Sequence, residues 1–209
     1  DSTSLELSAS RSDDSPEEGI VVGEDDDEFE ADFLVFELTA ENSDISVYGL
    51  EFDINSAPAT VDTDHMAQEL ILTCGDDEWT ELVPDACVQT DDVPFDDVEI
   101  EIEEDDTVVC TVSATMNEID GVTFEESASF SVDLDVSETD AEDATGENLA
   151  AADLTGTANG YDQTFISEGI VVDELDASAS VTFVADEASE TSQGTFTIEF
   201  DVTAYGTDV

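Results

Sequence analysis

Basic residues are almost absent from this chain of 209 residues. One Lys or Arg, Arg11, stands against 59 Asp and Glu, which gives a formal net charge of −58. Nucleic-acid binding depends on Lys and Arg side chains that neutralise phosphates, so the composition excludes it. Sites for phosphates or anionic membranes that rely on cationic side chains are excluded for the same reason. The partners that remain are cations, neutral surfaces and copies of the chain itself.

Side chains for covalent and acid–base catalysis are equally scarce. The chain has no Lys for Schiff-base chemistry, and its single imidazole, His65, lies among carboxylates in Asp62–Met66. Nucleophilic sites of the Ser-His-Asp or Cys-His kind need such a base. The sequence also contains no phosphate-binding loop and no dinucleotide glycine fingerprint. We therefore expect no enzyme and no required cofactor.

Long apolar runs are missing as well. No stretch is long enough to span a bilayer, so we expect no transmembrane segment. The sequence starts at Asp1 without Met. Removal of a signal peptide would explain that start, and so would trimming of the chain. We expect an extracellular or cell-surface protein.

The many acidic residues determine the salt concentration that folding needs. On a folded surface of roughly 9,000 Å² the acids would lie about 13 Å apart. One unscreened pair at that distance in water repels by about 0.3 kcal/mol, and every acid has many neighbours. Molar salt shortens the Debye length to about 3 Å and screens most of this repulsion. We therefore expect folding to need high Na⁺ or K⁺. The composition resembles that of proteins from extreme halophiles, haloarchaea above all.

The dominant pattern is alternation of apolar and acidic residues. It is clearest in Val98–Glu103, Phe130–Val136 and Phe196–Val202. A period of two places apolar side chains on one face of a strand and acids on the other. With a hydrophobic content of 40%, about nine or ten such strands predict an all-β fold with little helix. The expected architecture is an antiparallel β-sandwich, immunoglobulin-like or jelly-roll-like.

We expect one domain over residues 1–209. Residues 1–19 form a short strand and a polar segment that a neighbouring subunit could receive. Residues 137–163 are acidic and rich in small residues, which predicts a long loop or linker. The strands after this loop are too few for a second core, so we expect them to join the first sheet system. Asp64–Leu72 has some helical character.

Two short sequence motifs occur twice. Glu18–Val22 recurs as Glu168–Val172, and Glu51–Ile54 recurs in near-identical form as Glu199–Val202. One interpretation is duplication of a three-strand unit. The other is chance repetition in a sequence whose composition is biased toward acidic and strand-forming residues.

The three cysteines allow several pairings. Cys74 and Cys87 bracket an acidic segment, and Cys110 lies in an apolar alternating run. A Cys74–Cys87 disulfide is the pairing we expect, and it would contribute about 3 kcal/mol in the chain-entropy model. Pairing of Cys110 with either of the others, or free buried thiols, are the alternatives.

Metal binding needs only the oxygen ligands that this chain has in excess. Ca²⁺ takes carboxylate and carbonyl oxygens. The acidic loop that contains Asp25, Asp27 and Glu28 is the candidate Ca²⁺ site, although it lacks the EF-hand spacing. The alternative is that such loops hold hydrated Na⁺ or K⁺ diffusely.

Three segments carry a family resemblance. The short N-terminal strand, the run Phe33–Asn42 and the closing strand Thr195–Tyr205 resemble secreted β-sandwich filament proteins of the TasA and archaeal bundling-pilus type. The resemblance implies a homopolymer whose subunits donate an N-terminal strand to the next subunit. Leu5 and Leu7 would then occupy apolar slots of the neighbour.

The functional expectation is therefore a structural subunit of an extracellular, pilus-like filament of an extreme halophile. One alternative is a capsid, turret or spike protein of a virus that infects a halophilic host. The other is a Ca²⁺-binding or adhesin surface module.

Overall fold

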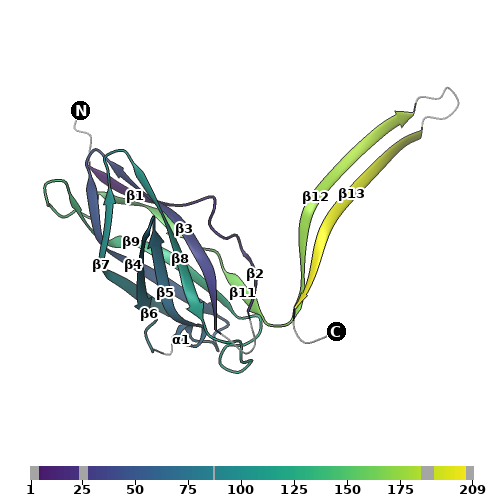
Figure 1. Ribbon diagram of the computed structural model, residues 1–209, viewed down its shortest axis with the longest axis horizontal. Coiled ribbons are helices and arrows are strands. Elements are labelled where there is room, and N and C mark those ends of the chain that lie inside the picture. The colour runs from purple at the N-terminus through teal and green to yellow at the C-terminus, as the bar shows by residue number, and fades with distance from the viewer. Residues whose placement is uncertain (1–4, 24–27, 87, 185–190, 206–209) are drawn as a thin grey trace. The chain divides into compact units, whose positions relative to one another are not determined.

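The computed structural model describes residues 5–23, 28–86, 88–184 and 191–205. The chain divides into two units, Asp1–Ile166 and Ser167–Val209, shown in Figure 1. In the first unit the elements are β1 (Glu6–Arg11), β2 (Gly19–Val22), β3 (Phe29–Glu41), β4 (Ile45–Ala57), α1 (Thr63–Met66), β5 (Ala67–Cys74), β6 (Asp77–Leu82), β7 (Thr90–Ile102), β8 (Thr107–Met116), β9 (Ser129–Asp143), β10 (Leu154–Asn159) and β11 (Gln163–Ile166). The second unit holds β12 (Gly169–Val184) and β13 (Thr191–Tyr205).

The expectation of an all-β chain with little helix is confirmed, since α1 spans only Thr63–Met66 in the described residues. The predicted helical character of Asp64–Leu72 is wrong beyond that turn. Residues from Ala67 onward form β5, whose alternate side chains, Leu70 and Leu72, are buried. Burial on alternate positions is possible in a strand, and it overrides a weak helical pattern.

The first unit is a mixed sheet that runs β2-β11-β9-β10-β1-β3-β8-β5-β6, while β4 pairs with both β7 and β9. The sheet folds back so that its two halves face each other in a sandwich-like arrangement. Phe36 of β3 packs on Phe52 of β4 with ring centroids 5.9 Å apart. Phe33 of β3 packs on Phe130 of β9 at 5.1 Å. All four rings are fully buried, and they mark the centre of the core.

The prediction of purely antiparallel pairing is wrong in two places. β1 runs parallel to β10, and β2 runs parallel to β11. The β1–β10 pair brings the backbones so close that a Cβ at Gly156 would lie 2.0 Å from the carbonyl oxygen of Ala9. Gly156 also has a φ of +90°, a conformation that glycine adopts without strain. This glycine therefore permits the parallel pairing.

The predicted loop at residues 137–163 is also wrong, because it contains the end of β9 and all of β10. Small residues lie there because β10 packs closely on β1, and Ala158 is fully buried.

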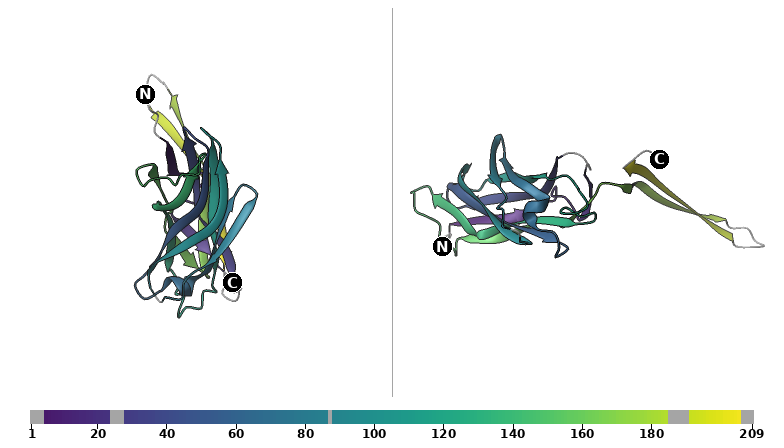
Figure 2. Two further views of the ribbon diagram at one scale, coloured as in Figure 1. Left: turned by 90° about the vertical axis from the view of Figure 1, so that its left-hand side faces the viewer. Right: turned by 90° about the horizontal axis from the view of Figure 1, so that it is seen from below.

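The expected single domain is replaced by two units. β12 and β13 pair only with each other in the described residues, as a separate antiparallel sheet. Figure 2 shows the two strands side by side along their length.

Candidate functional site

The predicted subunit-contact residues Leu5 and Leu7 lie in the chain's own core. β1 pairs with β3 on one side and β10 on the other, and Leu7 is 1% exposed. Leu5 is partly buried against the same core. Within a single chain, the slots that these side chains fill therefore belong to their own sheet, and their exchange into a neighbour's sheet stays a prediction.

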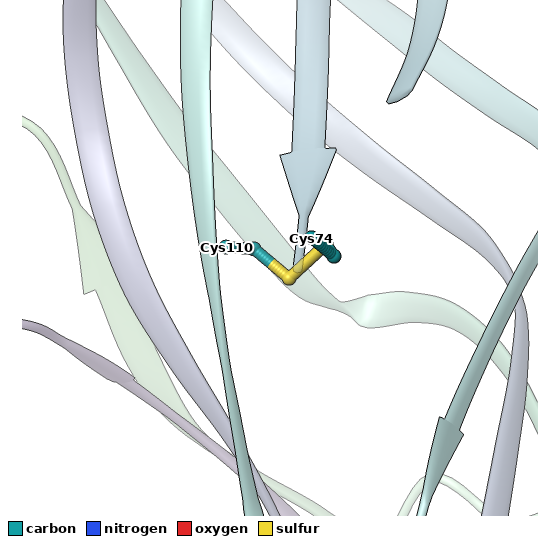
Figure 3. The surroundings of a disulfide bond; sticks show 2 residues. All are labelled: Cys74 and Cys110. Carbon is teal, nitrogen blue, oxygen red and sulfur yellow. A yellow bond between two sulfur atoms is a disulfide. The ribbon is translucent and has the colours of Figure 1, made fainter. Parts of the chain in front are cut away.

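The expected Cys74–Cys87 disulfide is wrong. Cys74 is bonded to Cys110, as Figure 3 shows. β5 and β8 are neighbouring antiparallel strands, and Cys74 and Cys110 lie directly opposite each other in their register. Their Cα atoms are 4.3 Å apart. The pairing follows from the order of strands in the sheet, and spacing along the sequence does not reveal that order. Residue 87 lies outside the described residues.

Most of the predicted Ca²⁺ site, Asp25 and Asp27, also lies outside the described residues. Glu28 is exposed and accepts a hydrogen bond from Gln68 Nε2. The structure gathers another group in the described residues, Asp62, Asp64 and His65, whose potential ligand atoms all lie within 4.8 Å of one another. Asp64 Oδ1 is buried and has no hydrogen-bond partner. These three side chains could supply three ligands to a divalent cation, at the start of a single helical turn.

A row of aspartates crosses the outer face of the sheet. Asp53 of β4 lies directly opposite Asp92 of β7 on one side and Asp133 of β9 on the other. We call these three residues the acidic row. Burial and then a hydrogen bond to the Asp92 side chain raise the pKa of Asp53 to about 6. Burial also raises the pKa of Asp133. Like charges directly opposite across strands are destabilising, so this row is an unfavourable surface for any partner that would desolvate it.

The second unit exposes a set of large apolar side chains. Each is between 55% and 77% exposed. We call them the apolar hairpin face: Ile170, Val172, Leu175, Phe196, Ile198, Phe200 and Val202.

Strand geometry explains why these side chains share a face. Alternate residues of β13 point the same way, and residues directly opposite in an antiparallel pair lie on the same side. Val202 lies opposite Val172, and Ile198 opposite Ala177. The register shifts between Glu174 and Asp176, with Leu175 as the extra residue. This extra residue moves the apolar positions of β12 from even to odd residue numbers. The apolar side chains therefore stay on the same side of the hairpin.

The opposite side of the hairpin is polar. The intervening positions of β13 are Thr195, Thr197, Glu199, Asp201 and Thr203, and Asp176 lies opposite Glu199. The hairpin is therefore amphipathic. The alternation in Phe196–Val202 predicts this strand correctly, but the expectation that it joins the first sheet system is wrong.

Sheet edges are a second place where chains can join, because they present unpaired backbone groups. The edge strands of the first unit are β2, β6 and β7. β6 carries Asp77, Glu78 and Glu81, and β7 carries Asp91, Asp92, Asp96, Asp97, Glu99 and Glu101. Charged edges of this kind resist strand addition. β2 has the sequence Gly-Ile-Val-Val and no charge, which makes it the edge most open to pairing.

Among the described residues, no helix is long and apolar enough to cross a membrane.

Comparison with known proteins adds no family. No family model and no curated protein matches the sequence. One solved structure with some similarity is AvmM, which catalyses macrocyclization in alchivemycin A biosynthesis. It is 11% identical over 77% of this chain and 88% of that chain, with a TM-score of 0.41. Another is a family 123 glycoside hydrolase from Clostridium perfringens, 8% identical over 78% of this chain and 27% of that chain, with a TM-score of 0.26. This chain spans about a quarter of that hydrolase. Similarities this low carry no argument about function.

Proposed function

We propose that this protein is a structural subunit of an extracellular, self-assembling filament of an extreme halophile, joined by contacts between β-strands of neighbouring copies. The observation that carries the proposal is the apolar hairpin face. Soluble monomers rarely expose large contiguous apolar patches, and such patches usually mark interaction sites. A two-stranded hairpin is at best marginally stable by itself in water. A partner that covers this face would therefore stabilise the hairpin.

The hairpin, and not the N-terminal strand, is the element that we assign to the joint. Extracting β1 for exchange would open the sheet between β3 and β10 and expose Leu7, which is 1% exposed. Full burial of a leucine side chain stabilises a fold by about 1.5–3 kcal/mol. The hairpin loses no such contact when it joins a neighbour, because its apolar side chains are already exposed.

An open filament needs two contacts on each subunit, because a single two-fold contact closes after one pair. The uncharged edge of β2 is the second contact that we propose. Strand addition at such an edge gives main-chain hydrogen bonds to a neighbouring copy. Ile20 of β2 is 55% exposed, and burial of its side chain beside an added strand would stabilise the pairing.

The charge determines the solvent in which copies can meet. With a net charge of −58, two copies repel strongly in dilute buffer. In molar salt the Debye length is about 3 Å, so apolar contact can outweigh the remaining repulsion. The proposal therefore places assembly in concentrated salt.

The test uses the full chain in 4 M NaCl, a salt concentration of the order that the charge requires. We expect wild-type protein to form polymers, seen by sedimentation velocity and electron microscopy, and Ile198→Asp to form nothing larger than a pair joined through β2. Thr197→Asp is the matched control, since it adds the same charge one residue away on the polar side of β13. It should assemble as the wild type does. Polymers of Ile198→Asp equal to those of the wild type would contradict the proposal, as would a wild-type protein that stays monomeric.

A further inference from the structure

We infer that the apolar hairpin face packs against the same face of a second copy, related by a two-fold axis parallel to the strands. This inference rests on the proposed self-assembly and names the surface that receives the hairpin. Three observations support a second hairpin as the occupant. They are the absence of a matching surface on the first unit, the shape of the face, and its area.

The described part of the first unit offers no apolar surface of similar extent. Its large exposed apolar side chains are scattered over separate strands and loops: Ile20, Tyr48, Leu82, Val88, Val109, Val122 and Tyr161. No two of the strands that carry them, β2, β4, β6 and β8, are paired with each other.

The acidic row makes the broad outer face of β7, β4 and β9 a still poorer acceptor. A hairpin packed there would remove the carboxylates of Asp92, Asp53 and Asp133 from water with no cation to pair with them. Burial of unpaired charge costs several kcal/mol per ion. The acids of the hairpin itself, such as Glu199 and Asp201, lie on its polar side. Two hairpins packed by their apolar sides would therefore leave these acids of both copies in solvent. Glu174, paired with Phe200, is the one acid of the described hairpin strands whose register falls at this contact.

The face is complementary to itself in shape. Large side chains lie opposite small ones at several rows of the face, on β12 where Ile170 pairs with Ala204 and on β13 further along the hairpin. Phe196 faces Ala179, and Ile198 faces Ala177. Around Ala177 and Ala179 the face is thus a ridge on β13 beside a groove on β12. A two-fold axis parallel to the strands sets the β13 ridge of each copy over the β12 groove of the other. At the usual spacing of about 10 Å between packed sheets, Phe196 of one copy would lie over Ala179 of its partner.

The area is that of a stable contact. A phenylalanine alone offers 150–250 Å², and the exposed fractions of the apolar hairpin face together amount to on the order of 800 Å² per copy. A standard protein–protein interface buries about 800 Å² on each partner. A second copy that covers the face would therefore bury the exposed apolar side chains of the hairpin. The contact would also have the size that a specific interface requires.

The test exchanges ridge and groove between two copies of the full chain. Ala179→Phe fills the groove and clashes with Phe196 of its partner, so it should weaken self-association about 100-fold, a loss typical of central interface positions. Phe196→Ala removes the ridge and should weaken it by a similar factor. A mixture of the two variants relieves the clash, because the enlarged residue of one copy meets the shortened residue of the other. We expect the mixed pair to bind within about tenfold of the wild type.

Fluorescence-detected sedimentation of one labelled variant against the other, in 4 M NaCl, measures these affinities. Wild-type association that Ala179→Phe leaves unchanged, or a mixture no tighter than either variant alone, would overturn the hairpin–hairpin contact while self-assembly stands. A wild type that does not associate at all would overturn the proposed function as well. Val122→Ala, a change to a similarly exposed residue of the first unit, is the control and should leave affinity unchanged.

Discussion

Asp53 shows how a single residue reports on the crowding of acids. Its pKa is raised to about 6, first by burial and then by Asp92, because both factors disfavour the charged form. Asp143 lies at the opposite extreme. A hydrogen bond from the Thr145 side chain, followed by one from the backbone of Glu147, lowers its pKa. The same residue type therefore opposes folding at one place and supports it at another.

The raised pKa of Asp53 predicts a fall in stability as pH rises. The folded state holds the proton up to about pH 6, whereas the unfolded chain loses it near 3.8. Between these values the folded state binds more protons, so the free energy of unfolding decreases with increasing pH. Asp53→Asn should remove this decrease and make the protein more stable at pH 7 by about 1 kcal/mol, after allowance for solvent screening.

Denaturant unfolding from pH 4 to pH 7 at a fixed 4 M NaCl measures this effect. Asp143→Asn is the control of opposite sign and should make the protein less stable at pH 7. A variant Asp53→Asn with the pH dependence of the wild type would rule out this role for Asp53.

At the scale of elements, alternation in the sequence located many strands but not their neighbours. Val98–Glu103 and Phe130–Val136 fall largely in β7 and β9, as their patterns predict. Period two states which residues share a face, and it says nothing about which strand lies alongside. The parallel pairing of β1 with β10 depends on contact between residues far apart in the chain, such as Ala9 and Gly156. No local pattern encodes such a contact.

The repeated motifs also show that a local pattern predicts a strand but not its neighbours. Gly19–Val22 forms an edge strand parallel to β11, whereas the identical residues Gly169–Val172 begin a long antiparallel hairpin. Phe52 and Ile54 are buried in the core, and their counterparts Phe200 and Val202 are more than half exposed. The repeated motifs therefore predict strands in both places. Whether their apolar side chains are buried depends on the neighbouring strands.

The Cys74–Cys110 bond yields a prediction at this scale. It closes a loop with a sequence separation of 36, which corresponds to about 4 kcal/mol in the chain-entropy model. Replacing both cysteines by alanine should lower the free energy of unfolding by about 2–4 kcal/mol, measured by denaturant unfolding in concentrated salt.

Peptide mapping without reduction provides the direct check. The peptides that contain Cys74 and Cys110 should be linked, and Cys87→Ala should leave that link in place. A linked pair of Cys74 and Cys87 peptides would show that the Cys74–Cys110 pairing is wrong.

At the scale of the whole molecule, the two units differ in how they bury apolar side chains. The first unit encloses a core of fully buried aromatic rings such as Phe33, Phe36 and Phe52. The second repeats the strand pattern of that core, but none of its described side chains is buried. In the proposed assembly, salt screens the charges of approaching copies, and burial of the apolar hairpin face holds them together.

Hydrogen exchange at different protein concentrations tests this account most directly. A hairpin that depends on a partner should protect the amides of Gly169–Val184 and Thr191–Tyr205 in concentrated protein and lose that protection on dilution at constant 4 M NaCl, because marginal elements open readily when uncovered. The amides of β3 and β4 should stay protected throughout. Equal protection of the hairpin at every protein concentration would contradict the claim that another copy covers it.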